Sequence, residues 1–139
     1  MEKKLRTAFA ILLILALSFA FAACGSKDDA DQKALEEAAD KLNAQCPMTI
    51  DSETVLDNVV ASAGKVFQYN YTLVNYASTD FTAEEVAELQ TTIEDYLIST
   101  IASNSDMAEL RDMGTTFKYV YKANDGVELV SITITPDQY

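Results

Sequence analysis

The sequence contains no histidine and no tryptophan, and it has only two cysteines among its 139 residues. Histidine is the most common general base and metal ligand, and it often activates a catalytic thiol. Its absence argues against Cys–His catalysis and against metal sites of the common His or multi-Cys kind. The sequence also has no glycine-rich phosphate loop and no Asp-x-Asp-x-Asp-Gly calcium loop. We therefore expect no metal, no cofactor and no enzymatic activity.

Basic residues are also scarce. The chain has 10 Lys and Arg against 22 Asp and Glu, which gives a net charge of −12. Residues 1–23 hold three of the basic residues and one acidic residue, so the rest of the chain carries seven against 21, or −14. Such a field repels phosphate backbones and anionic lipid headgroups. It argues against a nucleic-acid partner and fits a basic protein partner, or simple solubility.

The first 25 residues have the parts of an export signal. A cationic start within residues 1–6 precedes the uncharged apolar residues 7–21, which is the pattern of a signal peptide. Residues 21–25 then read Phe-Ala-Ala-Cys-Gly, which resembles the lipobox of bacterial lipoproteins. The resemblance implies that Cys24 receives a diacylglyceryl group and that the chain is cut before it. An ordinary secretory peptide with an incidental cysteine is the alternative.

This signal predicts how the chain is divided and where it works. We expect residues 1–23 to be the signal peptide, residues 24–31 an acylated cysteine with a polar tether, and residues 32–139 a single small domain. Two or three acyl chains hold a protein at a membrane effectively permanently. Residues 27–29, Lys-Asp-Asp, also resemble the acidic surface-export signal of some Bacteroidetes lipoproteins. The expected location is the cell envelope outside the cytoplasm, at the outer membrane or cell surface.

Three segments have helical patterns. Residues 31–45 place Ala and Leu at helical spacing, with charged residues largely elsewhere on the wheel. Residues 82–85, Thr-Ala-Glu-Glu, have the spacing of a capping box at the start of a long helix whose apolar stripe includes Tyr96 and ends at Ile101. Residues 105–113 can form a further short helix, and Gly114 suits the left-handed position that closes it.

The remaining patterned segments predict strands. Residues 66–76 alternate between apolar and polar side chains after a turn signal, and they pair with the segment before that turn. Residues 115–123 and 127–135 are joined at Asn-Asp-Gly, a strong hairpin signal. We predict an α+β fold of order αββ-α(α)-ββ, with two or three helices packed on a mainly antiparallel sheet of about four strands. Whether residues 48–50 add a fifth strand is left open.

The pattern Phe-x-Tyr-x-Tyr occurs twice, at residues 67–71 and 117–121. Strand alternation puts each trio on one sheet face, and the six rings make an aromatic band if the two strands are neighbours. In one interpretation this band is the core face under the long helix. In the other, part of it is open and binds a peptide or a glycan. The possible binding surface then consists of Tyr69, Tyr71, Tyr119 and Tyr121.

Two further features were considered as reactive sites. Cys46 is the only thiol left once Cys24 is acylated. We expect it to be buried, with an intermolecular disulfide or a reactive thiol as alternatives. Asp51, Glu53 and Asp57 cluster near the first predicted hairpin, and carboxylate pairs can perform acid/base or glycosidic chemistry. In so acidic a chain, however, such a cluster is expected on a solvated face.

Together these features predict a lipid-anchored, noncatalytic interaction module whose ligand the sequence does not name. It is held at the membrane through Cys24 and could bind an envelope protein. One alternative is an accessory or assembly lipoprotein of an envelope or secretion complex, which resembles the small lipoprotein pilotins in size, anchor and fold class. Another is a small envelope enzyme that uses Asp51, Glu53 or Cys46. The sequence does not predict the oligomeric state.

Overall fold

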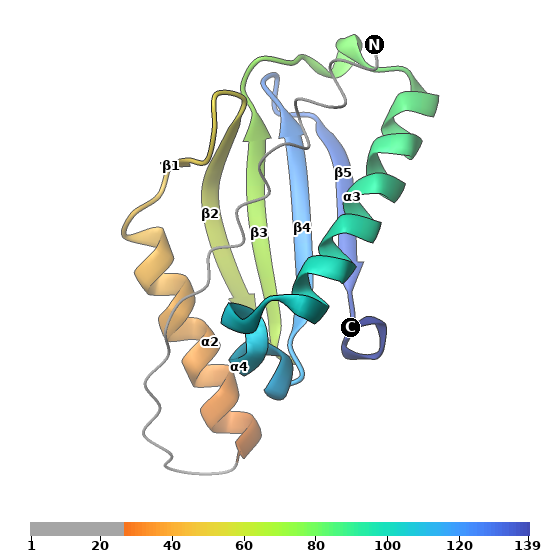
Figure 1. Ribbon diagram of the computed structural model, residues 1–139. Helices are drawn as coiled ribbons and strands as arrows, with labels where there is room; N and C mark the ends of the chain where they lie inside the picture. Colours follow the sequence, from red (N-terminus) through yellow and green to blue (C-terminus); the bar gives the residue numbers. More distant parts are fainter. Residues whose placement is uncertain (1–26) are drawn as a thin grey trace.

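The computed structural model describes residues 27–139, which form an α+β domain with three α-helices and a five-stranded sheet (Figure 1). The predicted signal peptide, the lipobox and Cys24 lie outside the described residues. Among the residues that the structure describes, no helix has the length and apolar character needed to cross a membrane.

The sheet has the strand order β1-β2-β3-β4-β5. The strands are β1 (Met48–Thr49), β2 (Thr54–Ser62), β3 (Val66–Leu73), β4 (Thr116–Ala123) and β5 (Glu128–Ile134). The two predicted hairpins, β2–β3 and β4–β5, are antiparallel. The short strand β1 joins the sheet as the fifth strand by pairing with the start of β2.

The prediction of a mainly antiparallel, four-stranded sheet was right in outline and wrong in one respect, because β3 and β4 pair in parallel. The connection between them contains the long helix α3 (Ala83–Ser103). Parallel neighbours need such a crossover, since the chain must return to the end of the sheet from which β3 started. Each hairpin is therefore antiparallel within itself, whereas the two hairpins join where β3 pairs in parallel with β4. We call this pairing the parallel seam.

The first helix, α2, spans Lys27–Asn43. It begins before Asp31, where the sequence pattern placed its start, so the predicted boundary was too late. Asp28 and Asp29 lie in its first turn, where negative side chains interact favourably with the helix dipole. Asp28 also forms an ion pair with Lys65 of the β2–β3 turn, at 3.2 Å. The charged composition that indicated a tether is thus compatible with a helical first turn.

The ends of α3 and of the short helix α4 (Ala108–Asp112) follow the sequence signals. At the start of α3, the backbone N–H of Glu85 donates to the Thr82 hydroxyl at 3.2 Å, and the Glu85 carboxylate accepts from the Thr82 N–H at 2.7 Å. This is the predicted capping box. Gly114 follows α4 with a φ of 69°, the left-handed conformation predicted for that position.

One sheet face carries the core. The alternate residues of β3 that face it are buried, whereas the residues between them are half-exposed. The helix α2 packs against β2, and α3 packs against β5 (Figure 1). The buried stripe of α3 consists of Leu89, Ile93, Leu97 and Ile101. Both long helices therefore contact the outer part of the sheet, and the central strands β3 and β4 lie between these contacts.

We expect Thr82→Ala to lower the free energy of unfolding by about 1 kcal/mol, because it removes the side chain that caps α3. The matched control is Thr91→Ala on the exposed face of the same helix, where alanine is the better helix former. Chemical denaturation of both variants measures the difference. Equal losses of stability in the two variants would contradict a specific role for the capping box.

Candidate functional site

The two aromatic trios lie side by side on the core face of the parallel seam. The strand register pairs Phe67 with Phe117, and it pairs the four tyrosines as Tyr69 with Tyr119 and Tyr71 with Tyr121. We call these four tyrosines the tyrosine row. The paired rings are stacked: their centroids are 5.0 Å apart for Tyr69 and Tyr119, and 4.9 Å for Tyr71 and Tyr121. The predicted aromatic band is therefore confirmed.

The tyrosine row is buried. The exposed fraction of each of its side chains lies between 1% and 4%. Stacked aromatic pairs contribute about 0.5–1.5 kcal/mol beyond the area that they bury. The row therefore belongs to the core, as the first of the two sequence-based interpretations expected. That interpretation also placed the long helix over the band, whereas α3 packs mainly on β5.

Three phenol hydroxyls of the tyrosine row have no hydrogen-bond partner within the described part of the chain. The phenol oxygens of Tyr69, Tyr119 and Tyr121 are buried, and none of them has a partner among the described residues. A buried hydroxyl without a partner costs about 1–3 kcal/mol. Phenylalanine would provide the same ring without this cost, so stability of the isolated domain does not account for the hydroxyls.

Burial also changes the acidity of these groups. Loss of solvation raises the pKa of Tyr69, Tyr71, Tyr119 and Tyr121 above the ordinary value of 10.0. For Tyr71 and Tyr119 the neighbouring phenols of the row raise the pKa further. The row is thus neutral at physiological pH and offers hydroxyl donors rather than charges.

The outer end of the row is flanked by two less buried side chains. Tyr96 of α3 is 44% exposed and lies near enough to Tyr121 to contribute to the rise of its pKa. Cys46, in the loop after α2, likewise contributes to the rise of the pKa of Tyr71. The sequence pattern counted Tyr96 in the apolar stripe of α3, and helical spacing alone could not distinguish it from its buried neighbours.

Cys46 is a free cysteine of intermediate burial that packs against the core. Burial raises the pKa of its thiol, and the negative charge of Asp57 raises it further. A raised pKa keeps the thiol protonated and therefore poorly nucleophilic. This environment suits the packing role expected for Cys46, although the residue is less deeply buried than predicted.

The structure gives each of the three clustered carboxylates its own local partner. Asp51 accepts backbone N–H bonds from Glu53 and Thr54, both at 2.7 Å. Glu53 accepts from the Tyr76 hydroxyl at 2.9 Å, and Asp57 from the Thr72 hydroxyl at 2.5 Å. These bonds organise the β1–β2 turn and tie β2 to β3. Among the residues that the structure describes, no group of His, Cys, Asp and Glu could hold a metal ion.

The chain belongs to a family that is known as a domain of unknown function, DUF8479, whose model matches residues 29–130. No curated protein matches the chain.

Solved structures share the fold at low sequence identity. A Pseudomonas aeruginosa protein to which secretion is ascribed superposes with a TM-score of 0.61 and 13% identity, over 84% of this chain and 98% of that protein. The type II secretion system pilotin AspS from Vibrio cholerae superposes with a TM-score of 0.57 and 14% identity, over 81% of this chain and 95% of the pilotin. The pilotin EpsS of the Vibrio vulnificus type 2 secretion system superposes with a TM-score of 0.59 and 14% identity, over 81% of this chain and 94% of the pilotin.

We expect Tyr119→Phe to leave the free energy of unfolding unchanged or to raise it by about 1 kcal/mol, because it removes a buried hydroxyl without a partner. Tyr76→Phe is the control, since its hydroxyl donates to Glu53 and its loss should cost about 1 kcal/mol. Urea denaturation measures both variants. A clear loss of stability in Tyr119→Phe would show that its hydroxyl has a partner.

The raised pKa values of the tyrosine row predict a loss of stability at high pH. Above pH 10 the unfolded chain ionises these phenols, whereas the folded chain keeps them protonated. The folded state then binds more protons, so its stability falls by about 1.4 kcal/mol per pH unit for each such tyrosine. Urea denaturation between pH 9 and about pH 11 measures the slope. Tyr121→Phe should make the slope shallower, and an unchanged slope would contradict this assignment.

Proposed function

We propose that this chain is a lipid-anchored accessory or assembly subunit of an envelope secretion complex, similar in its role to the pilotins. The observation that carries the proposal is the shared fold, which extends over 95% and 94% of the two pilotin chains. The lipobox at Cys24 supports it from the sequence side. In coarser terms, the protein is a noncatalytic binding module outside the cytoplasm, held at the membrane by acyl chains on Cys24.

We place the contact with the partner at Tyr96 of α3. This side chain is 44% exposed and lies near enough to Tyr121 to contribute to the rise of its pKa. Exposed tyrosine rings are common anchors of protein interfaces. The tyrosine row itself is buried and belongs to the core, so it does not contact the partner directly.

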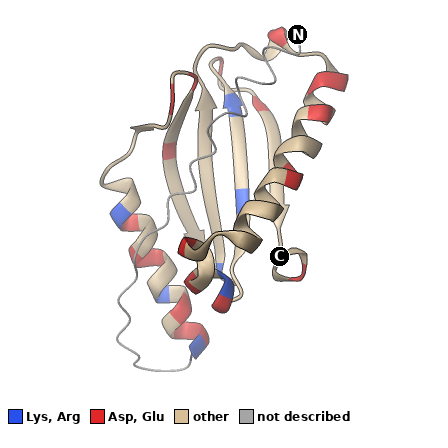
Figure 2. Ribbon diagram, viewed as in Figure 1, with Lys and Arg blue, Asp and Glu red and all other residues tan. Residues whose placement is uncertain are grey.

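The charge of the domain favours a basic partner. Figure 2 shows acidic residues along both α2 and α3, the two helices between which the tyrosine row lies. Their field attracts a positively charged protein and speeds its association, with an effect that falls as the ionic strength rises. It would also discriminate against acidic competitors. The field therefore contributes to partner choice, whereas Tyr96 provides the contact.

Site-specific photo-crosslinking in cells tests this assignment. A photoreactive phenylalanine analogue at position 96 should crosslink the partner, because Tyr96 borders the row. The same analogue at Thr91, on the exposed face of α3, is the matched control and should give little product. A Cys24→Ala variant should lose the anchor and most of the crosslink.

Mass spectrometry of the crosslinked material then decides between the candidate functions. One envelope protein, recovered from position 96 and not from position 91, is the expected result. Equal crosslinking from both positions would contradict Tyr96 as the point of contact. Recovery of the protein alone would contradict the accessory role and favour a small-molecule or glycan ligand.

A further inference from the structure

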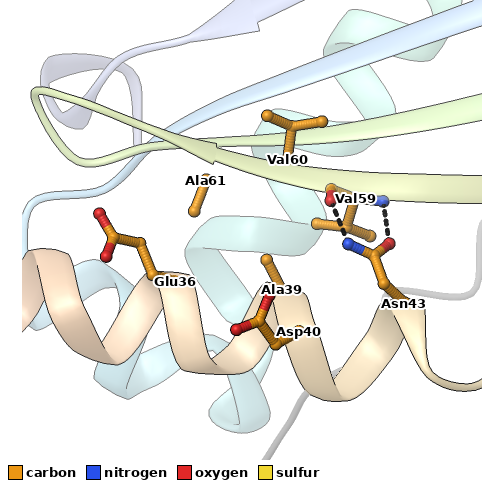
Figure 3. A pocket seen from close by; sticks show the side chains of 7 residues that line it. All are labelled: Glu36, Ala39, Asp40, Asn43, Val59, Val60 and Ala61. Atoms are coloured by element: carbon orange, nitrogen blue, oxygen red, sulfur yellow. Dashed lines mark hydrogen bonds between the residues drawn. The ribbon is translucent and has the colours of Figure 1, made fainter.

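A groove lies between α2 and β2 (Figure 3), and none of its lining residues belongs to the tyrosine row. Its volume is about 290 Å³. Three residues of β2 form its upper wall, and four residues of α2 form its lower wall. The lining residues are Glu36, Ala39, Asp40, Asn43, Val59, Val60 and Ala61.

Among the described residues, no strand covers the edge of β2 at this groove. The short strand β1 pairs only with Val55 and Leu56. One amide side chain of α2, that of Asn43, takes the place of a strand partner. Asn43 exchanges two hydrogen bonds with the backbone of Val59, at 2.7 and 2.8 Å. Gln32 donates to the carbonyl of Ser62 at 3.1 Å.

Ala61 lies two residues beyond Val59 on the same strand. The backbone groups of Val59 point away from β3, because they bond to Asn43. Hydrogen-bonding directions alternate along a strand, so those of Ala61 point to the same free edge, whereas those of Ser62 point toward β3. Asn43 does not bond to the backbone of Ala61, and Gln32 bonds to the β2–β3 turn instead. Asn43 thus protects this edge at Val59, as native proteins commonly do, and leaves Ala61 able to pair.

Two carboxylates stand beside this unpaired residue. Gln32, Glu36, Asp40 and Asn43 follow one another along α2 at helical spacing, so the row reads amide, carboxylate, carboxylate, amide. Both carboxylate residues are exposed, and Glu36 accepts a hydrogen bond from Gln32 at 3.2 Å. Figure 3 shows both carboxylate side chains on the helix that faces this part of β2. Negative charge is therefore concentrated where the strand edge is open.

The geometry of the β2 edge specifies which kind of residue in a partner strand would fit opposite Ala61. In an antiparallel pair, directly opposite residues exchange two backbone hydrogen bonds, and their side chains lie on the same sheet face. The side chain of Ala61 lies on the face covered by α2, because its partner in β3 is the buried Phe67. A residue opposite Ala61 would therefore direct its side chain toward Glu36 and Asp40. A cationic side chain matches these two carboxylates.

We propose that this groove binds a short, extended, basic segment of a partner protein. One residue of the segment forms a two-hydrogen-bond bridge with Ala61, and its Lys or Arg side chain lies between Glu36 and Asp40. Ala39 and Ala61 provide apolar contacts for the methylene stem. Asn43, which bonds to Val59, and the end of β2 at Ser62 limit the paired length to about this one residue. The site is separate from the tyrosine row and goes beyond the proposed function.

Titrating the ¹⁵N-labelled domain with the peptide acetyl-Thr-Val-Arg-Val-Thr-amide, followed by NMR, tests the proposal. The Ala61 amide should shift downfield as it forms a new hydrogen bond. The same peptide with glutamine in place of arginine, and one with an N-methylated arginine, are the ligand controls. The glutamine peptide should bind more weakly, and the N-methylated peptide should not shift the Ala61 amide.

Matched protein variants distinguish binding at this groove from an effect of the overall charge of the domain. The double variant Glu36→Gln with Asp40→Asn should bind the arginine peptide about tenfold more weakly, since two exposed ion pairs are lost. The double variant Glu84→Gln with Glu88→Gln removes the same charge from the exposed face of α3 and should bind normally. Equal weakening in both variants, equal affinity for arginine and glutamine peptides, or no shift at Ala61 would overturn the proposal. None of these outcomes bears on crosslinking from position 96.

Discussion

The parallel pairing of β3 with β4 is the constraint on which the rest of the structure depends. It places residues 67, 69 and 71 beside residues 117, 119 and 121, so that Tyr69 stacks on Tyr119 and Tyr71 stacks on Tyr121. The crossover that this pairing requires contains α3 and lays it on β5. The other long helix packs on β2. The two helices thus lie on either side of the aromatic seam, and the two proposed binding surfaces follow from this arrangement.

The seam and the edge of β2 have opposite chemistry. At the seam, buried and neutral hydroxyl donors lack acceptors among the described residues. At the edge, exposed carboxylates and one open backbone position lie beside an apolar wall. The first is closed to solvent, whereas the second is solvated and sensitive to ionic strength. The proposed partner contacts are therefore the exposed Tyr96 beside the seam and the groove at the edge.

Local features of the fold were predictable from the sequence, whereas the pairing of the two hairpins was not predicted. The capping box at Thr82 and the turn at residues 124–126 depend on neighbouring residues only. The parallel seam depends on contacts fifty residues apart. A signal for it was nevertheless present in the repeated Phe-x-Tyr-x-Tyr pattern, since an antiparallel pairing would have placed Phe67 near Tyr121. The groove beside Ala61 could not be predicted, because it depends on how far β1 extends along β2.

The central claim is that this domain acts by binding a protein partner in the cell envelope. Native mass spectrometry of the complex, extracted from its own membranes in a mild detergent, tests it most directly. We expect the lipidated chain to be recovered in a fixed stoichiometry with one larger envelope protein, and the complex to weaken as the salt concentration rises. Recovery of the lipidated chain alone, under conditions that preserve other envelope complexes, would contradict the claim.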